Sequence, residues 1–267
     1  MRQVGSPHGA LSAVYPFLTQ LAELCRVERT RAKWVLVPSH ALGHTLGERL
    51  ALEGTSWANL RFTTPLDLAL PMAAPFLVEG GIDPAPDGIG PALVMRLLLE
   101  LPSTVPSYFR HLAEQPKMAE ALWGAIRELR MAGLSAGDLP PRAFESPAKR
   151  AELAALLEAY ESHLTAQHLA DTAGVYREAL LHAELCPVRP GDLWTELPGV
   201  IWAPLERRLL DVLPGNRVAP TTLAIPGLET PRRLRALQAG LNRAQQPVVP
   251  APRSDAERLA FLMRPGE

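Results

Sequence analysis

Hydrophobic positions near the start of the chain alternate between short continuous runs and runs with helical spacing. Lys33–Pro38 (KWVLVP) is a continuous apolar run, typical of a strand that is buried on both faces. His40–Leu52 has apolar residues at helical spacing and predicts a helix, with Ser39 at the N-cap position and Gly54 as its stop. Asn59–Thr63 (NLRFT) then predicts a second strand.

Helical patterns lie on both sides of these strands. Leu11–Leu24 has helical spacing, and a further helix is predicted to begin after Thr64, with Pro65 at its first position and Asp67 in its first turn. Strands that alternate with helices over so short a span must pair in parallel, because each helix carries the chain back to the same end of the sheet. The pattern therefore predicts a parallel α/β layer.

The middle of the chain has a different character. Pro84–Pro91 is rich in proline and glycine and predicts a linker. From Ala92 to about Glu184 the spacing is helical nearly throughout, and we predict no strand there. The candidate helices are Ala92–Leu101, Pro106–Glu114, Met118–Met131, Pro147–Leu164 and Asp171–Ala183.

Strand patterns return in the last third of the chain. Gly199–Trp202 (GVIW) predicts a buried strand followed by the helix Pro204–Leu213, and Arg217–Ile225 contains another strand, most clearly at Thr222–Ile225. Two final helices are predicted at Pro231–Leu241 and Ser254–Met263. We therefore predict an α/β domain, formed by residues 1–83 and 187–267, that is split by an all-helical insertion at residues 84–186.

Composition places the chain among folded globular proteins. Of its 267 residues, 47% are hydrophobic and 21% are charged, which suits one large domain or two small ones. No apolar run approaches the roughly 20 residues of a membrane span, and the N-terminus lacks a signal pattern, so we expect a cytoplasmic protein. Cys25 and Cys186 are far apart and lack a CxxC partner, which argues against a disulfide framework or a zinc site.

Charge is unevenly distributed along the chain. The net charge is −1, but from Leu205 onward there are ten arginines against six acidic residues. Such a basic end is compatible with binding phosphates, and a solvated surface is the alternative interpretation. The candidate DNA-binding residues are Arg207, Arg208, Arg232, Arg233 and Arg235.

The groups that catalysis would need are missing from the sequence. No GxxxxGK[ST] phosphate loop occurs, and the nearest candidate, Gly5–Gly9, has no lysine. The predicted strand Gly199–Trp202 ends without the acidic residue that would hold magnesium, and Glu206 lies already in the next helix. No Glu-x-Lys of a PD-(D/E)XK nuclease occurs either. We expect no catalytic residue, no metal and no cofactor in this chain.

Two polar features allow a second interpretation. His40, His44 and Glu48 share one helix face, which fits a metal site or a polar surface stripe, and the lack of a third clear ligand favours the stripe. Ser39 lies on a strand-to-helix turn, which fits a nucleophile or an N-cap. The sequence places no His–Asp pair beside Ser39, and this favours the cap.

Five segments resemble AddB-like subunits of bacterial recombination nucleases. Trp34–Gly43 (WVLVPSHALG) and Asn59–Pro65 (NLRFTTP) are similar to the strand and turn after the phosphate loop in that family. Met118–Leu139 and Pro147–Asp171 are similar to its helical insertion, and Trp202–Leu213 (WAPLERRLLDVL) is similar to the stretch after its degenerate magnesium strand. Together the segments span Lys33 to Leu213.

The resemblance implies a P-loop-NTPase-like, superfamily-1 helicase-like domain with a helical insertion, joined in the whole protein to a PD-(D/E)XK exodeoxyribonuclease. Because the phosphate loop is degenerate here, the chain resembles the branch in which the motor is a scaffold. The sequence stops at Met263–Glu267, where a helix should lead on, so we expect a fragment.

Three functional hypotheses follow. The first is a non-catalytic, DNA-binding scaffold in double-strand-break processing and recombination repair, whose partners are DNA and a helicase subunit. The second is a protein–protein docking module for a helicase or nuclease partner. The third is an unrelated α/β hydrolase that uses Ser39, His40 and His44.

Overall fold

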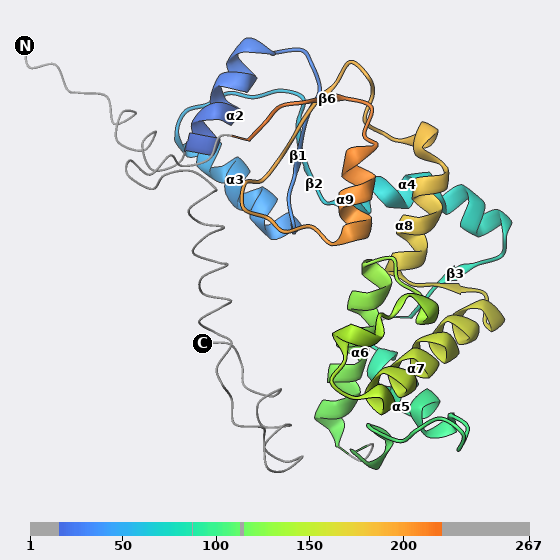
Figure 1. The fold of residues 1–267 in the computed structure, drawn as a ribbon. Helices are drawn as coiled ribbons and strands as arrows, with labels where there is room; N and C mark the ends of the chain where they lie inside the picture. The colour runs from blue at the N-terminus through green and yellow to red at the C-terminus, as the bar shows by residue number, and fades with distance from the viewer. Residues whose placement is uncertain (1–15, 87, 113–114, 221–267) are drawn as a thin grey trace, which may run out of the picture. The chain divides into compact units, whose positions relative to one another are not determined.

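The computed structural model describes residues 16–86, 88–112 and 115–220 (Figure 1). The predicted strand Thr222–Ile225 and the predicted helices Pro231–Leu241 and Ser254–Met263 lie outside these residues, as does the beginning of the predicted helix Leu11–Leu24.

A four-stranded parallel sheet forms the centre of the α/β part. The strand order is β2-β1-β5-β6, and every neighbouring pair is parallel. Two of the strands precede the helical segment in the chain and two follow it. The strands are β1 (Lys33–Leu36), β2 (Leu60–Thr63), β5 (Leu193–Glu196) and β6 (Asn216–Arg217).

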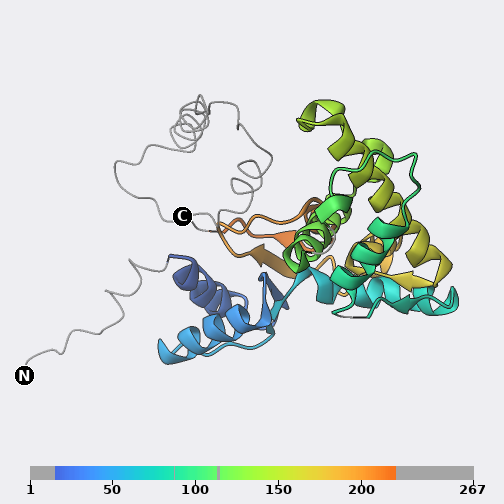
Figure 2. The ribbon, with the colours of Figure 1, turned by 90° about the horizontal axis from the view of Figure 1, so that it is seen from below.

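Helices cover both faces of this sheet. In Figure 2 the blue helices α2 and α3 lie on one side of the strands, and helices of the rest of the chain lie on the other. Successive side chains of a strand point to opposite faces, so Val35 and Val37 pack with α2 and α3, whereas Trp34 and Leu36 pack with α4, α8 and α9. The covering helices are α2 (Pro16–Val27), α3 (His40–Leu52), α4 (Pro65–Glu79), α8 (Thr172–Leu181) and α9 (Pro204–Asp211). The α/β fold with a parallel sheet is therefore confirmed.

Local capping signals begin α3 and α4 where the sequence predicts. Ser39 accepts a hydrogen bond from the Leu42 N–H at 3.4 Å. Thr64 and Asp67 form a reciprocal capping box at the start of α4. Gly54 follows α3 with φ of 76°, a conformation that glycine adopts without strain.

A helical block lies in the chain between the two halves of the sheet. It contains α5 (Gly90–Glu100), α6 (Pro116–Met131) and α7 (Pro147–Ala166), with the short 3-10 helices Arg110–Leu112, Ala136–Asp138 and Pro141–Ala143. A further 3-10 helix, Ala183–Leu185, follows α8. The predicted boundaries assign α8 to the insertion, but in the structure α8 packs on α4 in the core beneath the sheet.

Two expectations about this block are wrong. The described part of Pro106–Glu114 forms only the 3-10 turn Arg110–Leu112. The buried carboxylate of Glu152 accepts the backbone N–H groups of Tyr108 and Phe109, and this tertiary contact holds the segment outside a helix. The segment predicted to lack strands also contains β4 (Leu169–Ala170), which pairs in parallel with β3 (Asp83–Pro84).

The third sheet strand is also not where the sequence predicts it. Gly199–Trp202 forms no strand, Gly199 has φ of 82°, and the Ile201 side chain is 97% exposed. The strand is β5, Leu193–Glu196, all four residues of which are buried. No helix in the described part of the chain is long and apolar enough to cross a membrane.

Candidate functional site

Ligands of open parallel sheets bind beyond the carboxyl ends of the strands, where neighbouring strands send their helices to opposite faces. In this sheet that point lies between β1 and β5, because α3 follows β1 on one face and α9 is the helix after β5 on the other. The last residue of β5 is Glu196, whose residue surface is 8% exposed. Glu196 is therefore the residue from which a site at this edge would be built.

Both carboxylate oxygens of Glu196 are engaged by other side chains. Oε2 accepts hydrogen bonds from Trp202 Nε1 at 2.7 Å and from Arg207 Nη1 at 2.8 Å. Oε1 accepts a hydrogen bond from Arg217 Nη2. Burial raises the pKa of Glu196, but the hydrogen bond from Trp202, the charge of Arg207 and the hydrogen bonds from Arg207 and Arg217 outweigh burial and hold the pKa below its usual value. The charged carboxylate is thus closed off by two arginines and an indole.

This arrangement corrects the expectation that no acidic residue ends the later strand. Glu196 has that position, and it escaped the sequence analysis because the strand was placed at Gly199–Trp202. Within residues 16–86, 88–112 and 115–220, no three His, Cys, Asp or Glu side chains are grouped so that they could hold a metal.

The polar groups after β1 and β2 form a second pair at the same edge. His40 Nε2 lies 3.3 Å from Asp67 Oδ1. Burial raises the pKa of Asp67. The hydrogen bonds from the Thr64 backbone and hydroxyl and the charge of His40 outweigh burial, so the pKa lies below its usual value. The structure thus brings a His–Asp pair together, which the sequence analysis did not place.

Ser39 does not form a catalytic triad with His40 and Asp67 in the described part of the chain. Its hydroxyl caps α3, as predicted, and no described hydrogen bond joins it to His40. His44 and Glu48 are exposed on α3 and form no ion pair with another described residue. This is the arrangement of a polar surface stripe.

The predicted DNA-binding arginines have different surroundings. Arg207 is bound to Glu196 and also to Asp211 at 3.0 Å, so its charge is already balanced. Arg208 is exposed and has no acidic partner in the described part of the chain. Its guanidinium lies beside Gly133, at the end of α6. Arg232, Arg233 and Arg235 lie outside the described residues.

The three buried or half-buried carboxylates Asp67, Asp171 and Glu196 predict an acid-sensitive fold. Each has a pKa below its ordinary value in the folded state. A lowered pKa contributes stability that is complete above the ordinary carboxyl pKa of about 4 and is lost as the pH falls through the folded value. We expect the urea midpoint to be nearly constant from about pH 7 to 5 and to fall below about pH 4. A midpoint that rises on acidification below that value would contradict the assignment.

Two clefts are large enough for a small ligand. The first, of about 790 Å³, is lined by α6 and α7 and by the first residues of α8 and α9. Its charged lining includes Arg127 and Arg130, but also the carboxylates of Glu128, Asp171 and Glu206. Because acidic groups outnumber basic ones there, this cleft does not favour an anion.

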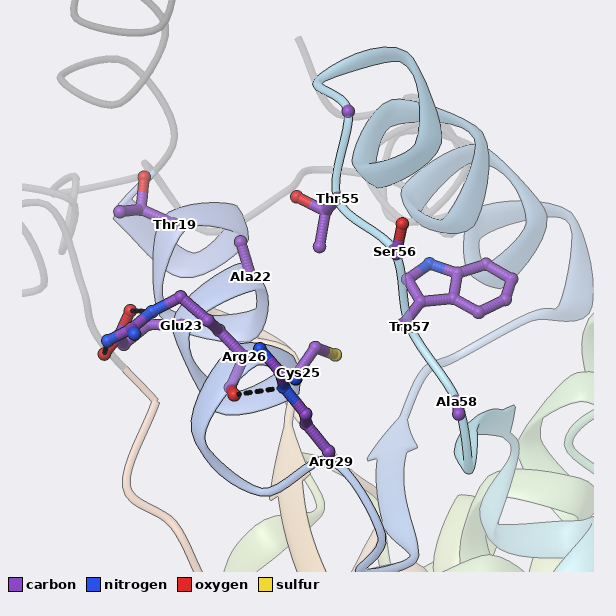
Figure 3. Close-up of a pocket in the computed structure, with 11 residues that line it drawn as sticks. Thr19, Ala22, Glu23, Cys25, Arg26, Arg29, Thr55, Ser56, Trp57 and Ala58 are labelled. Carbon is purple, nitrogen blue, oxygen red and sulfur yellow. Dashed lines mark hydrogen bonds and ion pairs between the residues drawn. The ribbon is translucent and has the colours of Figure 1, made fainter.

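The second cleft, of about 770 Å³, lies between α2 and the loop that joins α3 to β2 (Figure 3). Arg26 comes from the last turn of α2 and Arg29 from the bend that follows the helix, and Thr55, Ser56 and Trp57 come from the loop. This cleft was not predicted from the sequence, although Arg26 and Arg29 were a visible signal.

A scan of protein-family models finds no match to this chain, and a search of curated proteins finds none either.

Proposed function

We propose that this chain is a non-catalytic, DNA-binding scaffold segment of an AddB-like helicase–nuclease, which acts in double-strand-break processing and recombination repair. Its parallel sheet and helical block correspond, in this proposal, to a P-loop-NTPase-like, superfamily-1 helicase-like domain with an insertion. The observation that carries the proposal is the engagement of Glu196 at the end of β5 by Arg207, Arg217 and Trp202.

Two independent features support a scaffold over a motor. A magnesium ion needs free carboxylate oxygens, whereas both oxygens of Glu196 bind cationic or N–H donors. A triphosphate needs a glycine-rich loop with a lysine, and no GK[ST] occurs in the sequence. The two features are compatible with one another. A domain without a phosphate loop binds no triphosphate, and Glu196 then has no nucleotide-bound magnesium to hold.

DNA binding in this proposal depends on local arginines and not on the charge of the whole body. Acidic side chains outnumber basic ones in the described part of the chain, while the basic surplus lies from Leu205 onward. The structure describes three arginines after Leu205. Arg207 and Arg217 bind Glu196 and stabilise the fold, whereas Arg208 has no acidic partner among the described residues. A helicase subunit is the proposed protein partner.

We expect the whole chain to bind a labelled DNA oligonucleotide at low salt, with log K falling linearly as log salt rises. Arg208→Ala should reduce the slope by about 1 because it removes one phosphate contact. Arg207→Ala should leave the slope nearly unchanged and should lower the free energy of unfolding instead. Fluorescence anisotropy over a salt series measures the slopes. Absence of binding at low salt, or affinity independent of salt, would contradict the proposal.

Exposed apolar side chains on α4 and α8 favour a second candidate, a docking module for a protein partner. Leu70 and Val78 on α4 and Leu181 on α8 are 45%, 76% and 72% exposed. Apart from its terminal turns, α4 carries no charged side chain on any face. A helix with an exposed apolar face is typical of an interaction surface. A helicase-subunit complex that withstands high salt without DNA would favour this candidate over the first.

A further inference from the structure

The cleft between α2 and the α3–β2 loop contains donors that no described residue satisfies. Arg29 Nε donates to the Arg26 carbonyl at 3.3 Å, and its two terminal nitrogens have no acidic partner among the described residues. The hydroxyls of Thr55 and Ser56 likewise have no described hydrogen-bond partner, and in Figure 3 the Thr55 hydroxyl points toward α2 across the cleft. Arg26 differs from Arg29 because its guanidinium is bound to Glu23.

These donors define an anion site by their chemistry. The carboxylate of Glu23 is neutralised by Arg26, so Arg29 leaves the lining with a surplus positive charge. Burial raises the pKa of the Cys25 thiol, which therefore stays neutral and does not repel an anion. The two terminal nitrogens of Arg29 on one wall of the cleft, and the hydroxyls of Thr55 and Ser56 on the loop that forms the other wall, are donors of the kind that bind the oxygens of a phosphate group.

Trp57 adds an aromatic surface at the edge of the cleft. Its side chain is 42% exposed, and in Figure 3 the indole turns from the loop toward α3. There it lies against Gly47, where an added Cβ would be 3.9 Å from a ring carbon of Trp57. Exposed tryptophans stack on unpaired bases, and bases in a duplex are not available for such stacking.

We propose that this cleft binds a nucleotide of single-stranded DNA, with a phosphate held by Arg29, Thr55 and Ser56 and an adjacent base stacked on Trp57. The strand crosses the loop, so that its phosphate and its base lie on opposite sides of residues 55–57. This inference rests on the proposed DNA-binding function and adds the position and form of the bound strand. A free mononucleotide carries the same two groups, and the experiment distinguishes the two sources.

The charge contact is tested with the Arg29→Ala variant of the whole chain and a labelled oligothymidylate, by fluorescence anisotropy over a salt series. We expect the dissociation constant to rise about 3- to 10-fold at low salt and the salt slope to fall by about 1. Arg142→Ala is the matched control, because Arg142 is exposed on the helical block and its loss changes the net charge equally. Equal effects of the two variants would overturn the phosphate assignment.

The stacking contact has a different signature. Trp57→Ala should raise the dissociation constant about fivefold or more at low and high salt alike, because stacking on an aromatic side chain does not release counterions. Leu52→Ala is the control, since Leu52 is exposed at the end of α3 and is not part of the cleft lining. Circular dichroism of each variant verifies that the fold is retained. No change with Trp57→Ala would overturn the base assignment.

Two further outcomes separate the sources and the underlying function. Thymidine monophosphate should compete only at concentrations far above those of the oligonucleotide, because it lacks the neighbouring nucleotides. Competition at equal concentrations would overturn the single-strand proposal in favour of a mononucleotide site. If the wild-type chain binds DNA but no variant changes the affinity more than its control does, the cleft is not the binding site and the proposed function still stands. If the wild-type chain binds no DNA, both the cleft proposal and the proposed function are overturned.

Discussion

We expect Arg130→Ala to lower the free energy of unfolding by about 3–5 kcal/mol, because it leaves the partly buried Asp171 carboxylate without its ion-pair partner and leaves Glu161 only the more distant Arg177, at 3.6 Å. Arg130 lies on α6 and is 6% exposed. Its Nε and Nη2 donate to the two oxygens of Asp171 at 2.9 and 2.8 Å, and Nη1 donates to Glu161. The guanidinium thus joins α6 to α7 and to the N-cap of α8.

The Asp171 carboxylate gives this prediction a second measurable feature. Burial raises the pKa of Asp171, but the hydrogen bonds and charge of Arg130 outweigh that effect and the pKa is lowered. A lowered pKa contributes stability that is complete above the ordinary carboxyl pKa and is lost as the pH falls through the folded value. The stability difference between wild type and Arg130→Ala should therefore be largest near neutral pH and should shrink as the pH falls below about 4.

The control for Arg130→Ala is Arg96→Ala. Arg96 pairs with Glu100 on α5, and both side chains are more than half exposed, so solvent screens their attraction. We expect this variant to lose about 0–1 kcal/mol. Urea unfolding of the two variants and the wild type measures the differences. A loss of less than about 1 kcal/mol for Arg130→Ala would show that its ion pairs do not hold the helical block to α8.

Elements with strong local signals were predictable from the sequence. The strand Lys33–Leu36 follows from a continuous apolar run, and the starts of α3 and α4 follow from Ser39 and Thr64. These signals depend only on neighbouring residues: a capping side chain binds N–H groups two or three positions away, and apolar spacing fixes which face is buried.

Elements that depend on distant contacts were not predictable in this way. The strand β5 ends in Thr195 and Glu196, whose polarity hides the strand pattern, and Glu196 is tolerated there because Arg207 and Arg217 reach it from later in the chain. The loop before Arg110 is held by Glu152, more than forty residues away. No window of sequence contains both partners of such a contact.

The site shows the same division. The sequence identified Arg207 and Arg208 as charges but could not distinguish them, because only the fold shows that Arg207 is neutralised by Glu196 while Arg208 is exposed. The cleft at Arg29 escaped notice because it is formed by α2 and a loop that lie apart in the chain.

Magnesium–ATP turnover by the whole chain tests most directly whether the carboxyl edge of this sheet is closed. We expect no saturable turnover above background, and no difference between wild type and Glu196→Gln, because Arg207, Arg217 and Trp202 already engage both oxygens of Glu196. Saturable turnover that disappears in Glu196→Gln would contradict the account, since it would show that Glu196 exchanges its arginine partners for a metal and serves a working nucleotide site.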